Sequence, residues 1–153
     1  AELFQASSCD KSNKNNFSAI VVLKLGNAKV IVCGDNEKES FEKLMDQSDF
    51  RNAVKDAWVL VAPHHGRESG YYPEFVDLVN PYITVISDTS KSATSASSKY
   101  SSMSKGWEVY NAQNGKSENR LCITTRADGN IEIQFGETDD YRYSGFLHVD
   151  IHR

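Results

Sequence analysis

Three short apolar segments, each followed at once by small polar residues, most constrain how this chain can fold. Residues 30–33 (VIVC) precede Gly34-Asp35, residues 58–62 (WVLVA) precede a Pro-His-His-Gly tetrapeptide, and residues 82–86 (YITVI) precede Ser87-Asp88. Uninterrupted runs of four or five aliphatic and β-branched residues are typical of strands buried on both faces. In open α/β sheets, ligands collect at the carboxyl ends of such strands. We therefore expect an α/β protein with a site built from these three strand ends.

The segments around these strands predict a hairpin and helices. Residues 17–25 and 29–33 form two β-rich runs joined by the turn residues Gly26-Asn27, which favours a hairpin. A helix is expected after Asp35, with Asn36 as its N-cap and Glu39 three residues later. Further helical segments are predicted at 50–55 and at 73–79, the latter ended by Asn80-Pro81.

The C-terminal part of the chain is predicted to be mainly β. Residues 89–105 are dominated by serine, so we expect a mobile surface loop with one weak helical turn. A solvated loop is favoured over a phosphate site. Strands are predicted at 107–110, 120–126 and 131–135, with a hairpin turn at Asp128-Gly129-Asn130 between the last two. Residues 145–153 are expected to add an edge strand. His148, Asp150 and His152 would share one face of it, but a metal site there is disfavoured at a chain end.

Size, charge and cysteine content exclude little, but they set the context. The 153 residues suit one domain, and the formal net charge of −4 gives no overall attraction to nucleic acid, so a nucleic-acid substrate would need a basic patch or bound metal ions. Three cysteines without a CxxC pair favour reduced thiols, with Cys33 as a core residue. No apolar run suits a bilayer or a signal peptide. We expect a cytoplasmic chain without a membrane partner, and a mature secreted chain stays open.

The residues at the strand ends suggest metal chemistry. Asp35 offers carboxylate oxygen and His64 or His65 offers imidazole nitrogen, the mixed donor set used by zinc, manganese and iron. Two such ions would polarise a phosphoryl oxygen and lower the pKa of bound water. Simpler interpretations remain open at this stage. Asp35 would suit a helix cap, the histidines would suit loop residues bonded to carbonyls, and Ser87-Asp88 would suit a turn.

The order of these motifs resembles the second half of a metallo-β-lactamase-fold hydrolase, and most of all the hydrolase domain of competence-type DNA uptake proteins. The resemblance covers about residues 15–135 and is carried by residues 15–18 (NNFS), 34–35 (GD), 59–66 (VLVAPHHG), 80–88 (NPYITVISD) and 124–133 (TTRADGNIEI). It implies an αββα sandwich with a mixed sheet and flanking helices, two divalent metal ions, zinc or manganese, and phosphodiester hydrolysis. On this basis residues 1–16 are an irregular lead-in, 17–136 the half-domain, and 137–153 a tail or edge strand.

The resemblance also implies a role for each matched residue. Asp35 corresponds to the carboxylate that bridges the two metal ions, His64 to a ligand of the second ion, and His65 to a neighbouring catalytic residue that orients substrate or carries a proton. The order of the two histidines is left open. Ser87 and Asp88 would shape the substrate groove.

One part of the family pattern is missing from this chain. The family's first-half run His-x-His-x-Asp-His, which supplies most of the metal ligands, does not occur in the sequence. The resemblance therefore implies that the remaining ligands lie on an N-terminal half, present as a separate chain or cleaved fragment. We predict part of a nuclease, with nucleic acid or another phosphodiester as substrate. The alternatives are an inactive interaction module and a hydrolase of another ester or amide.

Overall fold

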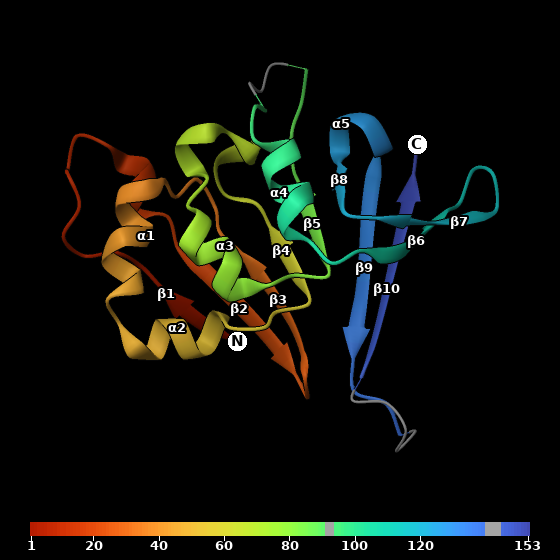
Figure 1. Cartoon of the computed structure of the whole chain (residues 1–153), viewed down its shortest axis with the longest axis horizontal. Helices are drawn as coiled ribbons and strands as arrows, with labels where there is room; N and C mark the ends of the chain where they lie inside the picture. The colour runs from red at the N-terminus through yellow and green to blue at the C-terminus, as the bar shows by residue number, and fades with distance from the viewer. Residues whose placement is uncertain (91–93, 140–144) are drawn as a thin grey trace.

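The computed structural model describes residues 1–90, 94–139 and 145–153 as a mixed α/β protein with two sheets and flanking helices (Figure 1). Over these ranges the larger sheet has six strands in the order β1-β2-β3-β4-β5-β8. Their bounds are Glu2–Phe4, Ile20–Leu25, Ala28–Val32, Val59–Val61, Ile83–Ile86 and Cys122–Thr124. Strands β3, β4, β5 and β8 run parallel, while β1 and β2 are antiparallel to their neighbours. The predicted hairpin and the three buried strands are thus confirmed.

The smaller sheet follows the order β7-β6-β10-β9 in the described part of the chain. Its strands are Trp107–Asn111 (β6), Lys116–Arg120 (β7), Asn130–Gly136 (β9) and Phe146–His152 (β10). The C-terminal strand was expected at an edge, but β10 pairs with β6 on one side and with β9 on the other. Its alternating residues Leu147, Val149 and Ile151 are buried, so the apolar face of β10 favours an internal place in the sheet.

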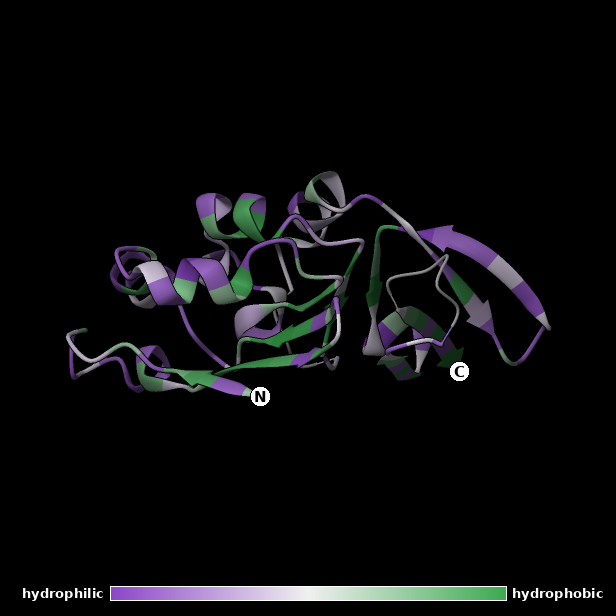
Figure 2. Ribbon diagram, turned by 90° about the horizontal axis from the view of Figure 1, so that it is seen from below, coloured by the Kyte–Doolittle hydropathy of each residue, from purple (hydrophilic) through white to green (hydrophobic). Residues whose placement is uncertain are grey.

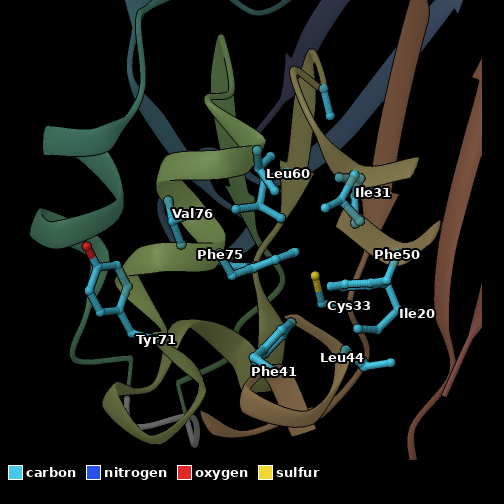
Figure 3. Close-up of a cluster of buried hydrophobic side chains, with 14 of the residues drawn as sticks. Ile20, Ile31, Cys33, Phe41, Leu44, Phe50, Leu60, Tyr71, Phe75 and Val76 are labelled. Carbon is cyan, nitrogen blue, oxygen red and sulfur yellow. The ribbon is translucent and has the colours of Figure 1, made fainter. Parts of the chain in front are cut away.

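Helices cover one face of the six-stranded sheet, as Figure 2 shows. They are Lys38–Met45 (α1), Ser48–Val54 (α2), Pro73–Val79 (α3) and Ser97–Met103 (α4). Aromatic side chains from these helices, among them Phe41, Phe50 and Phe75, form a buried core with Leu60 and Ile31 of the sheet (Figure 3). This core holds the helices against the sheet, and the candidate site lies at the carboxyl ends of the parallel strands.

A second core lies between the two sheets. Val59 and Ile83 of the larger sheet pack with Val149 and Ile151 of β10. Because side chains alternate along a strand, Leu60, which lies next to Val59, faces the helices instead. The central strands are therefore buried on both faces, as their uninterrupted apolar sequences predicted.

The start of α1 differs from the expectation. Its N-cap is Glu37, which makes no capping hydrogen bond through its side chain. The Asn36 side chain instead donates through Nδ2 to the carbonyl oxygens of Ser18 at 2.9 Å and Cys33 at 2.7 Å. Asn36 therefore connects the segment before β2 to the end of β3, because two backbone carbonyls converge on its amide.

The serine-rich segment and the lead-in contain more regular structure than the sequence predicted. Residues 97–103 form α4, anchored by the fully buried Tyr100, and Glu2–Phe4 pairs with β2 as strand β1. The part of the expected loop at 91–93 lies outside the described residues. A single aromatic anchor is too weak a pattern to indicate a helix among serines.

The predicted hairpin at residues 128–130 is wrong. The chain from 120 to 126 divides into the end of β7, the short strand β8 and the helical turn Thr125–Asp128 (α5). Strand β8 belongs to the larger sheet and β9 to the smaller one, so Gly129 connects two sheets. Asp128 is buried and accepts hydrogen bonds from Arg120 and from the Thr124 backbone, which favours the helical turn.

None of the described helices is long and apolar enough to span a bilayer.

Candidate metal centre at the carboxyl ends of the parallel strands

The parallel strands bring the three predicted motifs to one edge of the larger sheet. Asp35 follows β3, the histidine pair follows β4 and Ser87 follows β5, and all three motifs meet at a pocket of about 150 Å³. The His64 backbone N–H donates to the Gly34 carbonyl at 2.9 Å and fastens the first two strand ends together. The expectation that these segments converge is met by the fold.

The turn after β4 has an unusual backbone. His64, His65 and Gly66 have φ angles of 47°, 56° and 68°, all in the left-handed region that costs a non-glycine residue about 1–2 kcal/mol. Hydrogen bonds hold it there, including Thr94 Oγ1 to the His65 carbonyl at 3.0 Å and the Ala96 N–H to the Gly66 carbonyl at 3.0 Å. Such strain persists where the surroundings enforce it and concentrates at functional sites.

His65 faces Asp35 with a defined orientation. Its Nδ1 lies 2.6 Å from the Ser87 carbonyl oxygen, and because a carbonyl only accepts, we assign the hydrogen to Nδ1 and the lone pair to Nε2. Nε2 lies 3.5 Å from Asp35 Oδ1, with the two side chains 42% and 48% exposed. Two electron-pair donors therefore face each other at the pocket, an arrangement that a proton or a metal ion between them stabilises.

The separation of these two donors suits a metal ion. With metal–ligand bonds of about 2.1 Å and tetrahedral angles, two ligand atoms of zinc lie about 3.4 Å apart. A ligating histidine also usually donates its other ring N–H to a carbonyl or carboxylate, as His65 does to Ser87. Asp35 and His65 thus fit two positions of a mixed nitrogen and oxygen coordination shell.

His64 lies in a different environment. Its side chain is 12% exposed, with Nδ1 at 2.9 Å from Ser69 Oγ and 3.3 Å from Glu37 Oε1. Nε2 lies 3.3 Å from Arg67 Nη1, and since a guanidinium only donates, that nitrogen accepts. Both ring nitrogens are occupied inside the protein. The geometry therefore favours the reversed order of the two histidines over the choice of His64 as ligand.

Ser87 and Asp88, predicted to contact substrate, are placed differently from each other. Ser87 is exposed and offers its carbonyl to His65. Asp88 is 6% exposed, and its carboxylate accepts hydrogen bonds from Thr94 Oγ1 at 2.9 Å and from the Arg126 backbone at 3.1 Å. In this structure the Asp88 carboxylate is therefore engaged by the protein itself.

Several residues near the site were not identified from the sequence. Glu37 and Arg67 surround His64, and Thr94 and Thr125 lie around the Ser87-Asp88 segment. Threonine is common and Thr125 fell inside a predicted strand, so neither residue stood out. Only the pairing of β5 with β8 brings Thr125 beside Asp88.

Donor groups elsewhere in the described residues do not assemble into a larger metal centre. Across the ranges 1–90, 94–139 and 145–153, no three His, Cys, Asp or Glu side chains form a metal-binding group. His148, Asp150 and His152 lie opposite Gln134, Glu132 and Asn130 across β9 and β10. His152 Nε2 lies 3.8 Å from Glu132 Oε2, and Glu132 Oε1 also accepts a hydrogen bond from Gln134 Nε2 at 2.7 Å.

The cysteines are free thiols and behave as packing residues. Cys33 is fully buried in the helix-side core, as predicted, and burial raises its pKa. Burial also raises the pKa of the Cys122 thiol to about 11. The thiolate is the form that binds metals, so these environments disfavour cysteine as a ligand.

Comparison with known proteins gives one informative similarity. No family model matches the chain, and no solved structure matches it. Over 78 residues it is 33% identical to ComE operon protein 3 of Bacillus subtilis, an alignment covering 51% of this chain and 10% of that protein. The chain thus spans about a tenth of the length of this relative.

Proposed function

We propose that this chain is part of a metal-dependent hydrolase of phosphodiester bonds, most simply a nuclease. The observation that carries the proposal is the pairing of His65 Nε2 with Asp35 Oδ1 at 3.5 Å. Both donors stand at the carboxyl ends of parallel strands, where α/β proteins bind ligands. A strained turn and a hydrogen bond to a carbonyl hold the imidazole in place.

The proposed cofactor is a pair of divalent ions, zinc or manganese. Bound at this edge, such ions would polarise a phosphoryl oxygen and lower the pKa of a water molecule. Asp35 would contribute carboxylate oxygens to both ions, and His65 would contribute Nε2 to one. The Ser87 carbonyl would keep the His65 ring in its binding orientation. The loops after Gly66 and Ser87 would border the phosphodiester.

The remaining ligands are proposed to come from an N-terminal half on a separate chain or cleaved fragment. An apolar face on β1 and β2 suits such a partner. Leu3, Leu23 and Leu25 are exposed, and β-sheet register places them on the side of the sheet that carries the second core. Contiguous apolar surface of this kind marks interaction sites. The similarity to part of ComE operon protein 3, a much longer protein, agrees with a half-domain.

The test compares the chain alone with the chain joined to the polypeptide encoded before Ala1 in its gene. Hydrolysis of bis(p-nitrophenyl) phosphate and of single-stranded DNA is measured with Zn²⁺ or Mn²⁺. We expect the joined protein to be active, and Asp35→Asn and His65→Gln to lower its activity at least about 100-fold. His152→Gln, outside the pocket, is the matched histidine control and should retain full activity.

Three outcomes would overturn the proposal in whole or in part. A folded, joined protein that binds neither metal would indicate an interaction module. Metal-dependent activity that survives loss of both Asp35 and His65 would place the centre elsewhere. Activity only toward carboxylic esters or amides would keep the metal site and replace the phosphodiester substrate.

A further inference from the structure

We infer that Thr125 is a positioning residue for His65, acting through the Ser87–Asp88 peptide group. The inference rests on the proposed role of His65 as a metal ligand and extends it to a residue on the neighbouring strand. Thr125 follows β8, and its hydroxyl lies against the backbone of Asp88.

The Ser87–Asp88 peptide group is held from both sides. Its carbonyl oxygen, from Ser87, accepts a hydrogen bond from His65 Nδ1 at 2.6 Å. Its N–H, from Asp88, donates to Thr125 Oγ1 at 2.9 Å. Because the peptide group is planar, fixing the direction of the N–H also fixes the direction of the carbonyl. The Thr125 hydroxyl therefore sets where the Ser87 oxygen points.

The Thr125 hydroxyl has one defined orientation. It donates to the Asp88 carbonyl oxygen at 2.7 Å, so its lone pairs are free to accept from the Asp88 N–H. A peptide group that donates at its N–H is polarised and accepts more strongly at its carbonyl. The hydroxyl thus strengthens the hydrogen bond that keeps the hydrogen on His65 Nδ1.

The Asp88 side chain supports the same arrangement from another direction. Its carboxylate accepts from the Arg126 N–H and from Thr94 Oγ1, and the Thr94 hydroxyl also lies 3.0 Å from the His65 carbonyl. The loop after β5, the turn after β8 and the left-handed turn that carries His65 are therefore joined by hydrogen bonds. With this network in place, His65 Nε2 is directed at Asp35.

The chain provides a matched control in the preceding residue. Thr124 Oγ1 accepts from the Ala127 N–H at 3.0 Å and caps α5. Thr124 and Thr125 are both half-buried, and replacing either by valine removes one hydroxyl with little change in shape. Of these two threonines, Thr125 is the one that contacts the peptide group that binds His65, so the two variants separate positioning from local stability.

The primary measurement is the tautomer of the His65 ring, determined by ¹⁵N NMR on histidine-labelled protein without added metal and assigned with His65→Gln. We expect the wild type to hold the hydrogen on Nδ1. Thr125→Val should shift the population toward Nε2–H, whereas Thr124→Val should leave it unchanged and Thr125→Ser should restore the wild-type spectrum. If the valine variant does not fold, Thr125→Ala removes the same hydroxyl without a β-branched side chain.

The second measurement is the Zn²⁺ affinity, by calorimetry, of the chain joined to the proposed N-terminal half, because that half is proposed to supply the remaining ligands. Loss of an outer-shell partner typically weakens metal binding 10- to 100-fold. The Zn²⁺ affinity of Thr125→Val should therefore be lower than that of the wild type by about this factor, and the affinity of Thr124→Val should stay within about twofold of it. An unchanged tautomer in Thr125→Val, or equal losses in both valine variants, would overturn the inference. If the wild type binds no zinc while the tautomer shift is present, the proposed function fails and the positioning role stands.

Discussion

Gly66 ends the left-handed turn that carries the two histidines, and it has little room for a side chain. Its φ is +68°, and an added Cβ would lie 2.8 Å from Ile86 Cδ1 and 2.9 Å from Ile86 Cγ2. A side chain at this position would therefore cause both backbone strain and a clash with Ile86. The turn therefore depends on glycine for both conformation and space.

We predict that Gly66→Ala lowers the free energy of unfolding by about 3 kcal/mol, the sum of a left-handed alanine and a tight core contact. Gly115→Ala is the control, because Gly115 has the same φ of +68° with nothing within 4 Å of an added Cβ. It should cost only about 1 kcal/mol. Urea unfolding of both variants gives the comparison, and equal losses would show that the Ile86 contact is unimportant.

At the scale of single residues, the sequence predicted which segments meet but not how each side chain is oriented. Asp35 and the histidine pair were identified because they follow apolar runs. The assignment of His65 to the pocket depends on the φ angles of the turn, which adjacent identical residues cannot reveal. The proximity of Thr125 to Asp88 depends on the pairing of β5 with β8, and these strands are far apart in the sequence.

At the scale of elements, helix α4 rests on one aromatic side chain. Tyr100 is fully buried in the helix-side core, and its hydroxyl oxygen is buried without a hydrogen-bond partner in the described residues. Its ring packs edge-on against Tyr71 at 5.0 Å. The ring therefore stabilises α4, while the hydroxyl contributes nothing.

We predict that Tyr100→Phe leaves the free energy of unfolding within about 0.5 kcal/mol of wild type or raises it, because it removes an unpaired buried polar group. Tyr100→Ala should cost about 3–5 kcal/mol through the cavity it leaves. Thermal unfolding of the pair checks both values. A loss above about 1 kcal/mol in the phenylalanine variant would mean that the hydroxyl has a partner.

The elements that the sequence predicted are those with strong local patterns. Strands β2 to β5 and helix α3 have uninterrupted apolar runs or clear ends, and they appear close to the expected bounds. Strand β7 (KSENR) is entirely polar and lies at a sheet edge, so no alternation indicates it. Residues 120–126 were predicted as one strand, although they contain the end of β7, strand β8 and the start of α5. The passage from the smaller sheet to the larger one has no signature in the local sequence.

The exposed leucines of β1 and β2 lie on strands outside those that form the second core. The residues of that core come from β3, β4, β5 and β8 in the larger sheet. Leu23 and Leu25 therefore lie on the same side of the sheet as the second core and remain exposed, with Leu25 next to Gly136 of β9. This is the surface that we assign to the proposed N-terminal half.

We predict that changing Leu23 and Leu25 together to lysine weakens association with that half at least tenfold, because charges would have to be buried at the contact. The stability of the isolated chain should change by no more than about 0.5 kcal/mol at these exposed positions. Leu121→Lys, at a leucine exposed elsewhere, is the control. Sedimentation velocity of the mixed halves measures the difference, and undiminished association would place the contact on another face.

The late position of β8 affects how the chain acquires its site during synthesis. Asp35, His65 and Ser87 leave the ribosome before the hairpin of β6 and β7, and Thr125 follows Asp88 by 37 residues. The nascent chain therefore holds both donors of the site before it has the hydroxyl that orients one of them. The His65 imidazole is oriented only after β8 and Thr125 have been translated. A chain on a ribosome stalled before that point would hold Asp35 and His65 without the hydroxyl that positions the imidazole.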